Sequence, residues 1–135
     1  VMLRGIKFGL PICEDIWQPD VSECLQESGA DILVALNASP FDSAKLERRM
    51  STAVARAIET GCFVLAPAQC GVHSATRGPE RKTWGHSLVI SPWGEVIADG
   101  GDAPGVVSAI LDLDEIAGAR QRVPSLVGAQ AIVGP

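Results

Sequence analysis

The sequence lacks the long apolar runs and the clustered basic residues that mark membrane and nucleic-acid-binding proteins. Its longest apolar runs, Ile32–Leu36 and Cys62–Ala68, are far shorter than the ~20 residues of a transmembrane helix. It has 11 Lys and Arg against 16 Asp and Glu, and no stretch gathers the basic residues into a phosphate-binding stripe. The sequence contains no basic segment followed by an apolar stretch, which is the pattern of a secretory signal. We therefore expect a cytoplasmic protein that binds neither nucleic acid nor membrane.

Paired cysteines and phosphate-binding glycine loops are also missing. None of the four cysteines (Cys13, Cys24, Cys62 and Cys70) stands in a Cys-x-x-Cys pair, so free thiols in a reducing compartment are expected. Cys70 and His73 make one possible ligand pair, which is too few residues for a structural zinc site. No glycine pattern of the P-loop or dinucleotide-binding type occurs. The sequence therefore predicts neither a metal nor a cofactor.

The patterning predicts one α/β domain. The chain has 135 residues, of which 47% are hydrophobic and 20% charged, enough to build a core. Apolar residues alternate from Ile6 to Ile12, which predicts a strand, whereas the runs at 32–36 and 62–68 are typical of strands covered on both faces. Helical spacing predicts helices at 20–29 and at 43–61, the second capped by Asp42 or Ser43. This alternation of strands and helices indicates βαβ units.

The second half of the chain is predicted as short elements joined by turns. We expect a polar surface loop at 71–85, strands at 86–91 and 95–98 around a turn at 92–94, a strand at 106–111, a helix at 114–122 and a tail from 124 onwards.

Cys13 is the main candidate for chemistry, because it stands where a predicted strand gives way to a turn. Open α/β sheets bind their ligands at the carboxyl ends of their strands. Glu14 and Asp15 follow immediately, and two adjacent carboxylates disfavour a thiolate, so a cation from another part of the protein would be needed. The alternative is a buried structural cysteine.

The remaining cysteines and the two histidines have simpler interpretations. Cys24 and Cys62 fall on predicted apolar faces and are expected to serve in packing. His86 is expected to form a structural hydrogen bond, and His73 to be solvated. Either imidazole could instead fold back to form a dyad with Cys13.

Several segments, in order, resemble landmarks of the carbon-nitrogen hydrolase, or nitrilase, superfamily. They are GLPICEDIWQP at 9–19, RAIETG at 56–61, APAQCG at 66–71, WGHSL at 84–88 and SPWGE at 91–95, followed by Asp112, Asp114, Arg122 and Pro124. The resemblance spans essentially the whole chain. It implies the α/β, four-layer α-β-β-α sandwich of the nitrilase type, with residues 1–135 as its C-terminal half. It also implies a homodimer or a larger homo-oligomer.

The same resemblance implies a mechanism without a cofactor, in which a Glu, a Lys and a Cys hydrolyse a small amide or nitrile through a thioester. Cys13 corresponds to the nucleophile, and the backbone N–H of Glu14 to the donor that stabilises the oxyanion. The family's Glu and Lys precede the Cys, but only 12 residues precede Cys13 here, and Lys7 is too close along the same strand. We therefore expect a partial domain that holds one of three catalytic residues and is inactive alone.

Two subfamilies and one non-enzymatic role remain as alternatives. Residues 13–17 and 37–41 resemble the glutaminase domain of glutamine-dependent NAD synthetase, in which Ser39 and Lys45 would hold glutamine. Lys45 is otherwise a solvated residue in the first turn of a helix. Residues 66–94 resemble stand-alone amidases of the omega-amidase and deaminated-glutathione-amidase type, although Trp17 replaces an Arg that many simple amidases carry. The third possibility is an inactive remnant that acts through its dimer surface.

Overall fold

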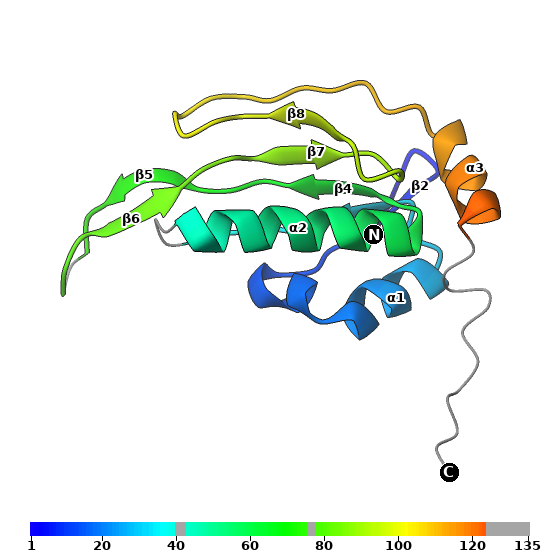
Figure 1. The fold of residues 1–135 in the computed structure, drawn as a ribbon, viewed down its shortest axis with the longest axis horizontal. Coiled ribbons are helices and arrows are strands. Elements are labelled where there is room, and N and C mark those ends of the chain that lie inside the picture. Colours follow the sequence, from blue (N-terminus) through cyan, green and yellow to red (C-terminus); the bar gives the residue numbers. More distant parts are fainter. Residues whose placement is uncertain (40–42, 76–77, 124–135) are drawn as a thin grey trace, which may run out of the picture.

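The computed structural model describes residues 1–39, 43–75 and 78–123, with no account of the side chains of 43–45. Figure 1 shows the order of the elements along the chain. They are β1 (Met2–Leu3), β2 (Ile6–Gly9), a 3-10 helix (Cys13–Trp17), α1 (Pro19–Glu27), β3 (Ile32–Val34), α2 (Ser43–Thr60), β4 (Phe63–Ala66), β5 (Cys70–His73), β6 (Arg81–Trp84), β7 (Leu88–Ile90), β8 (Val96–Asp99) and α3 (Asp114–Arg122).

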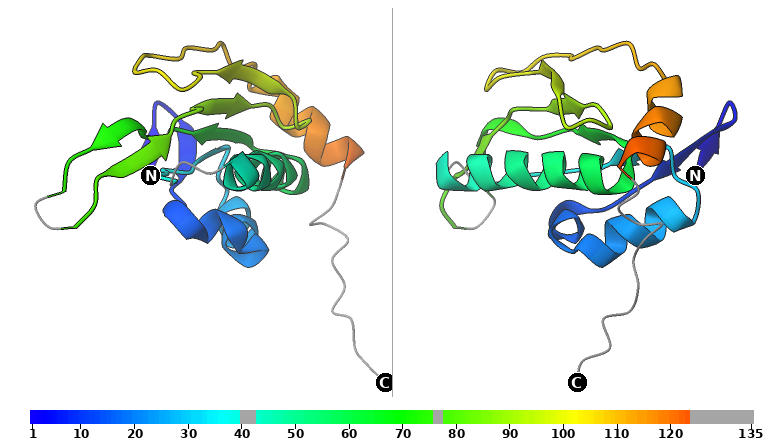
Figure 2. Two further views of the ribbon diagram at one scale, coloured as in Figure 1. Left: turned by 60° about the vertical axis from the view of Figure 1, so that its left-hand side comes forward. Right: turned by 45° about the vertical axis from the view of Figure 1, so that its right-hand side comes forward.

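The main sheet of the described residues has six strands in the order β1-β2-β3-β4-β7-β8. Strands β2, β3 and β4 are parallel neighbours, and β1, β7 and β8 join them antiparallel. The helices α1 and α2 form the two crossovers between the parallel strands, and both lie on the same face of the sheet (Figures 1 and 2). The βαβ arrangement predicted from the sequence is confirmed.

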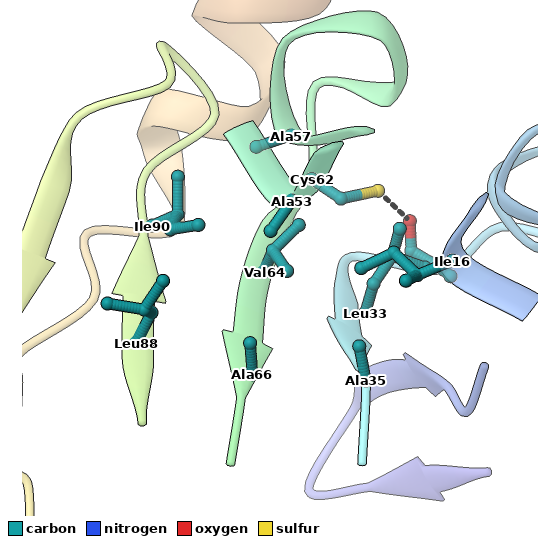
Figure 3. Packing of buried hydrophobic residues seen from close by; sticks show 11 residues of the cluster. Ile16, Leu33, Ala35, Ala53, Ala57, Cys62, Val64, Ala66, Leu88 and Ile90 are labelled. Carbon is teal, nitrogen blue, oxygen red and sulfur yellow. Dashed lines mark hydrogen bonds between the residues drawn. The ribbon is translucent and has the colours of Figure 1, made fainter. Parts of the chain in front are cut away.

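The main core lies between this sheet face and helices α1 and α2. Leu33, Val64 and Ile90 are fully buried on neighbouring strands, and Ala53 and Ala57 meet them from α2 (Figure 3). The small alanines allow the helix to approach the sheet closely. In such a core, truncation of one large side chain to alanine costs about 2–5 kcal/mol.

The opposite sheet face is covered in part by α3. Ile116 of α3 packs with Ile32 and Phe63. The guanidinium of Arg120, also on α3, donates to the backbone carbonyls of Thr60 (3.2 Å) and Ala30 (2.7 Å). These bonds hold α3 at the end of the sheet where β3 and β4 begin. The predicted helix at 114–122 is therefore confirmed.

The predicted strand at 106–111 is wrong, because this segment forms no strand ladder within the described chain. Val106 and Ile110 are 95% and 96% exposed. Leu111 nevertheless packs against the cluster formed by Ile32, Phe63 and Ile116. An alternating apolar run becomes a strand only where a partner offers its backbone groups, and β8 is paired with β7 alone.

The loop predicted at 71–85 is also wrong, because it contains the β5–β6 hairpin. The register pairs Cys70 with Trp84 and His73 with Arg81. Thr83 is the one buried residue of these two strands, so no apolar alternation marks them in the sequence. The hairpin stands apart from the main sheet (Figure 1).

The N-terminal strand is shorter than predicted. Strand β2 ends at Gly9, before Pro11, which has no N–H to give to a sheet ladder. Ile12 then makes an isolated parallel bridge with Leu36. Cys24 on α1 is exposed, so its predicted packing role is wrong, whereas Cys62 is buried as predicted.

Candidate functional site

The three parallel strands converge at their carboxyl ends, beyond the last ladder residues. Bridges extend the alignment, with Ile12 beside Leu36 and Asn37 beside Ala68. The backbone N–H of Cys13 donates to the carbonyl of Leu36 at 2.9 Å. This edge is where an open α/β sheet binds ligands, and it brings Cys13 and Asn37 together.

Cys13 occupies a strained and exposed turn at this edge. Its φ is 54°, in the left-handed region that few residues other than glycine adopt. The Asp15 carboxylate caps the turn by accepting a hydrogen bond from the N–H of Ile12 at 2.9 Å. Strain of this kind persists only where surrounding contacts enforce it, and it is concentrated at functional sites.

The segment that carries Cys13 is fixed to the core from below. The Ile16 side chain, in the same 3-10 helix, is buried in the main core. The Nε of buried Arg56 on α2 donates to the Ile16 carbonyl at 3.1 Å. Arg56 also pairs with Glu59 one turn along the helix. The nucleophile candidate therefore stands on a rigid base although its side chain is exposed.

A pocket of about 550 Å³ opens beside Cys13, a volume suited to a small molecule. Its lining residues come from four parts of the chain: Cys13, Glu14, Trp17 and Gln18; Asn37, Ala38 and Ser39; Arg48; and Arg81. A second hollow of about 450 Å³ adjoins it and also reaches Cys13. A third, of about 470 Å³, lies against Val34, Leu65 and Leu111 and does not include Cys13.

The predicted site residues meet in the 550 Å³ pocket, with one exception. Cys13, Glu14 and Ser39 all line it. The hydroxyl of Ser39 donates to the Asn37 side-chain oxygen at 2.5 Å. Lys45 lies in the first turn of α2, and its side chain is outside the described residues.

Neither histidine lines this pocket. The Nδ1 of His86 hydrogen bonds to the Asp99 carboxylate at 2.9 Å, as its predicted structural role required. The Nε2 of His73 lies 2.7 Å from the Thr83 hydroxyl in the β5–β6 hairpin, so this half-buried side chain is not fully solvated as predicted.

The pocket also contains residues that the sequence analysis did not single out. Arg48 lies on the face of the 43–61 helix that was predicted to point outward. Arg81 lies in the segment at 71–85 that was predicted to be a surface loop. The Arg81 guanidinium donates to the carbonyl of Ala38, next to Ser39. A dense run of charged residues around 77–82 was the one signal in the sequence that could have pointed to Arg81.

Buried Arg49 connects α2 to the junction between β6 and β7. Its guanidinium donates to the carbonyls of Gly85, at 3.2 Å, and His86, two consecutive residues with positive φ. A Cβ on Gly85 would meet the Gly101 carbonyl oxygen at 2.7 Å, so this turn requires glycine. Burial lowers the pKa of Arg49, and the nearby Asp99 carboxylate opposes that shift.

Asp99 completes this junction. Burial works against its ionisation, but hydrogen bonds from His86 and from the Gly101 N–H outweigh burial and hold the pKa of Asp99 below its ordinary value. The junction is therefore a hydrogen-bonded link between α2 and β8, next to the hairpin that carries Arg81.

Two features are absent from the residues that the structure describes. No group of three or more His, Cys, Asp or Glu side chains among them is arranged to hold a metal ion. Within those same ranges, no helix is both long and apolar enough to cross a membrane.

The fold places the chain among nitrilase-type α/β proteins. The crystal structure of a carbon-nitrogen hydrolase from Helicobacter pylori G27 superposes with a TM-score of 0.86 at 25% identity, over 94% of this chain and 47% of that one. The family model described as carbon-nitrogen hydrolase matches residues 1–121. The chain belongs to the carbon-nitrogen hydrolase family.

Relatives with amidase names share more of the sequence. A deaminated glutathione amidase from Synechocystis is 39% identical over 118 residues, which are 87% of this chain and 42% of that protein. A 2-oxoglutaramate amidase from Bacillus subtilis is 38% identical over 122 residues, 90% of this chain and 44% of that protein. The chain thus spans less than half the length of these relatives.

Proposed function

We propose that this chain supplies the nucleophile and part of the binding pocket of an amidase that acts on small carboxamides. The observation that carries the proposal is Cys13 itself, an exposed thiol at positive φ, where three parallel strands end in a pocket. Membership of the carbon-nitrogen hydrolase family and the amidase names of the relatives support the same chemistry.

In the proposed reaction, the Cys13 thiolate attacks the amide carbonyl carbon and forms a tetrahedral oxyanion. When this intermediate collapses, the C–N bond breaks and ammonia leaves with a proton from a general acid, so that a thioester remains on Cys13. Water then loses a proton to a general base and attacks the thioester, which releases a carboxylate and the thiol. The resemblance implies a Glu for these proton transfers and a Lys beside the oxyanion, both expected outside residues 1–135.

The backbone N–H of Glu14 is proposed as an oxyanion donor. N–H groups in the first turn of a helix have no partner within that helix, and Glu14 directly follows Cys13 in the 3-10 helix. An N–H fixed in this way stabilises developing negative charge without reorganisation.

Glutamine hydrolysis in an NAD synthetase remains the second candidate. It is supported by Ser39, which lines the same pocket as Cys13. The named relatives at 38–39% identity favour the stand-alone amidase. Assembly into a homodimer or a larger homo-oligomer is proposed from the resemblance, and sedimentation of the full-length protein would test it.

Ammonia release from a panel of small amides by the full-length protein tests the proposal. We expect Cys13→Ala to lower kcat on the order of 10³-fold or more, because no other group replaces the nucleophile. Cys24→Ala is the matched control, since Cys24 is also exposed but lies on α1 outside the pocket. Turnover that survives in Cys13→Ala would overturn the proposal. We also expect residues 1–135 alone to release no ammonia.

A further inference from the structure

We propose that the side-chain NH2 group of Asn37 donates a hydrogen bond to the carbonyl oxygen of the amide that Cys13 attacks. Asn37 would then be a further catalytic residue, a side-chain donor for the oxyanion. The inference rests on the proposed function, since it concerns the same reaction at the same site. Asn37 belongs to the segment after β3, whereas the proposed Glu14 donor belongs to the segment that carries Cys13.

Asn37 lies level with Cys13 on the neighbouring segment of the chain. Ile12 and Leu36 form a parallel bridge, and the N–H of Cys13 donates to the Leu36 carbonyl at 2.9 Å. The residue that follows the bridge is Cys13 on one segment and Asn37 on the other. Neighbouring strands lie about 4.8 Å apart, so a carbonyl group held at the thiol is within reach of the Asn37 side chain.

Asn37 also borders the same space as the thiol. The pocket of about 550 Å³ and the adjoining hollow of about 450 Å³ share three of the described residues, Cys13, Asn37 and Ala38. Of these three, Cys13 and Asn37 have a polar side chain. An amide that reaches the thiol from either hollow therefore lies beside the Asn37 side chain.

The backbone and the carboxamide of Asn37 are both held in place. Its N–H donates to the Pro67 carbonyl, and its carbonyl accepts from the Gln69 N–H, each at 3.0 Å. Its side-chain oxygen accepts a hydrogen bond from the Ser39 hydroxyl at 2.5 Å. This contact occupies the acceptor, and the NH2 group makes no hydrogen bond to the described residues, so it is open to a ligand. A donor that is fixed before the substrate binds stabilises developing charge without reorganisation.

The first step of the proposed reaction places negative charge at this donor. When the thiolate attacks, the C–S bond forms and the carbonyl π electrons move to the oxygen. An oxyanion accepts stronger hydrogen bonds than a neutral carbonyl oxygen does. The Asn37 donor therefore contributes more in the transition state than in the bound substrate, and its loss should lower kcat with little change in KM.

The kinetic test uses the full-length protein and the amide of the panel that it hydrolyses fastest. We expect Asn37→Ala and Asn37→Asp to lower kcat by about 10²- to 10³-fold and to change KM less than about threefold. Asn37→Asp keeps an oxygen that accepts from Ser39, so the loop contact remains while the donor is lost. Ser39→Ala removes that contact but not the donor, and should lower kcat by less than about 10-fold.

Gln26→Glu is the matched control, because it makes the same change from amide to carboxylate on α1, outside the pocket. It should leave kcat and KM unchanged. A wild-type kcat in Asn37→Asp would overturn the inference. So would equal losses of kcat in Asn37→Ala and Ser39→Ala, because that outcome indicates that Asn37 only shapes the loop.

Butanal gives a second readout that needs no turnover. The Cys13 thiol adds across the aldehyde C=O bond: sulfur bonds to carbon, and the thiol proton goes to the oxygen, which then lies where the oxyanion forms. Protection of Cys13 from methyl methanethiosulfonate, a thiol reagent without a carbonyl, measures the dissociation constant of butanal. We expect this constant to rise about 10-fold or more in Asn37→Ala. Without butanal, the rate of Cys13 modification should stay within about threefold of wild type in this variant.

The two readouts separate this inference from the proposed function. If butanal protects wild-type Cys13 and Asn37→Ala equally, or protects neither, the inference fails, and the proposed function stands as long as turnover requires Cys13. If the protection depends on Asn37 but no amide is hydrolysed, the proposed function fails and the donor role of Asn37 stands.

Discussion

At the residue scale, the proposed function depends on a cysteine in a backbone conformation that lowers the stability of the fold. The left-handed region costs a residue with a Cβ about 1–2 kcal/mol, and Cys13 has a φ of 54°. The cost is tolerated because Ile16, Arg56 and Asp15 hold the turn in place. This conformation leaves the Cys13 thiol accessible at the carboxyl ends of the three parallel strands.

This strain can be measured by removing the side chain in two ways. Cys13→Gly and Cys13→Ala should both lack amidase activity, but the Gly variant should be the more stable by about 1 kcal/mol, because only glycine adopts positive φ without cost. Urea unfolding of the two full-length variants gives the difference. An Ala variant as stable as the Gly variant would contradict the claim that the Cys13 turn is strained.

The candidate nucleophile could be singled out from the sequence, whereas most of the residues around it in the pocket could not. Cys13 follows an alternating strand, and its motif resembles that of a known family. Arg48 and Arg81 give no such signal, because a charged residue on a helix or in a polar stretch is usually solvated. Only the folding of the hairpin against the Ala38 loop brings Arg81 to the pocket.

At the element scale, the link from α2 through the β6–β7 turn to β8 positions the hairpin. Arg49, His86 and Asp99 form this link. Beyond a structural hydrogen bond expected of His86, neither the link nor the hairpin was predictable from the sequence. The hairpin buries a single side chain of its two strands, Thr83, so apolar periodicity could not reveal it. The buried strands β3 and β4, by contrast, were predictable from the sequence because each forms a continuous apolar run.

The Asp99 end of this link predicts a pH dependence of stability. The pKa of Asp99 in the folded protein lies below its ordinary value of 3.8, so folding favours the carboxylate form. The resulting stability is fully present above the unfolded-state pKa and is lost as the pH falls through the folded-state pKa. The difference in unfolding free energy between wild type and Asp99→Asn should therefore be constant near neutral pH and shrink below about pH 4.

Urea unfolding of the full-length protein from pH 7 to pH 3 measures this difference. Asp102→Asn serves as a control, because it alters an exposed carboxylate in the neighbouring turn. A difference for Asp99→Asn that does not change with pH would show that its carboxylate is not stabilised by the link.

At the scale of the whole molecule, one sheet places the candidate nucleophile Cys13 at the carboxyl ends of its parallel strands and leaves apolar surface exposed elsewhere. Helices α1 and α2 cover one face, and α3 covers part of the other (Figure 2). Val106 and Ile110 remain almost fully exposed. The overall α/β class and the βαβ order followed from the sequence pattern, whereas the course of 106–111 depends on partners that a pattern does not specify.

The most direct test of the central claim is to trap the acyl group on Cys13. The full-length protein would be mixed with a small amide that it hydrolyses, quenched in acid within its first turnovers, digested and analysed by mass spectrometry. The proposed function predicts an acyl thioester on the peptide that contains Cys13, absent from Cys13→Ala and removed by hydroxylamine. Ammonia release without acylation of Cys13, or acylation of another cysteine, would contradict it.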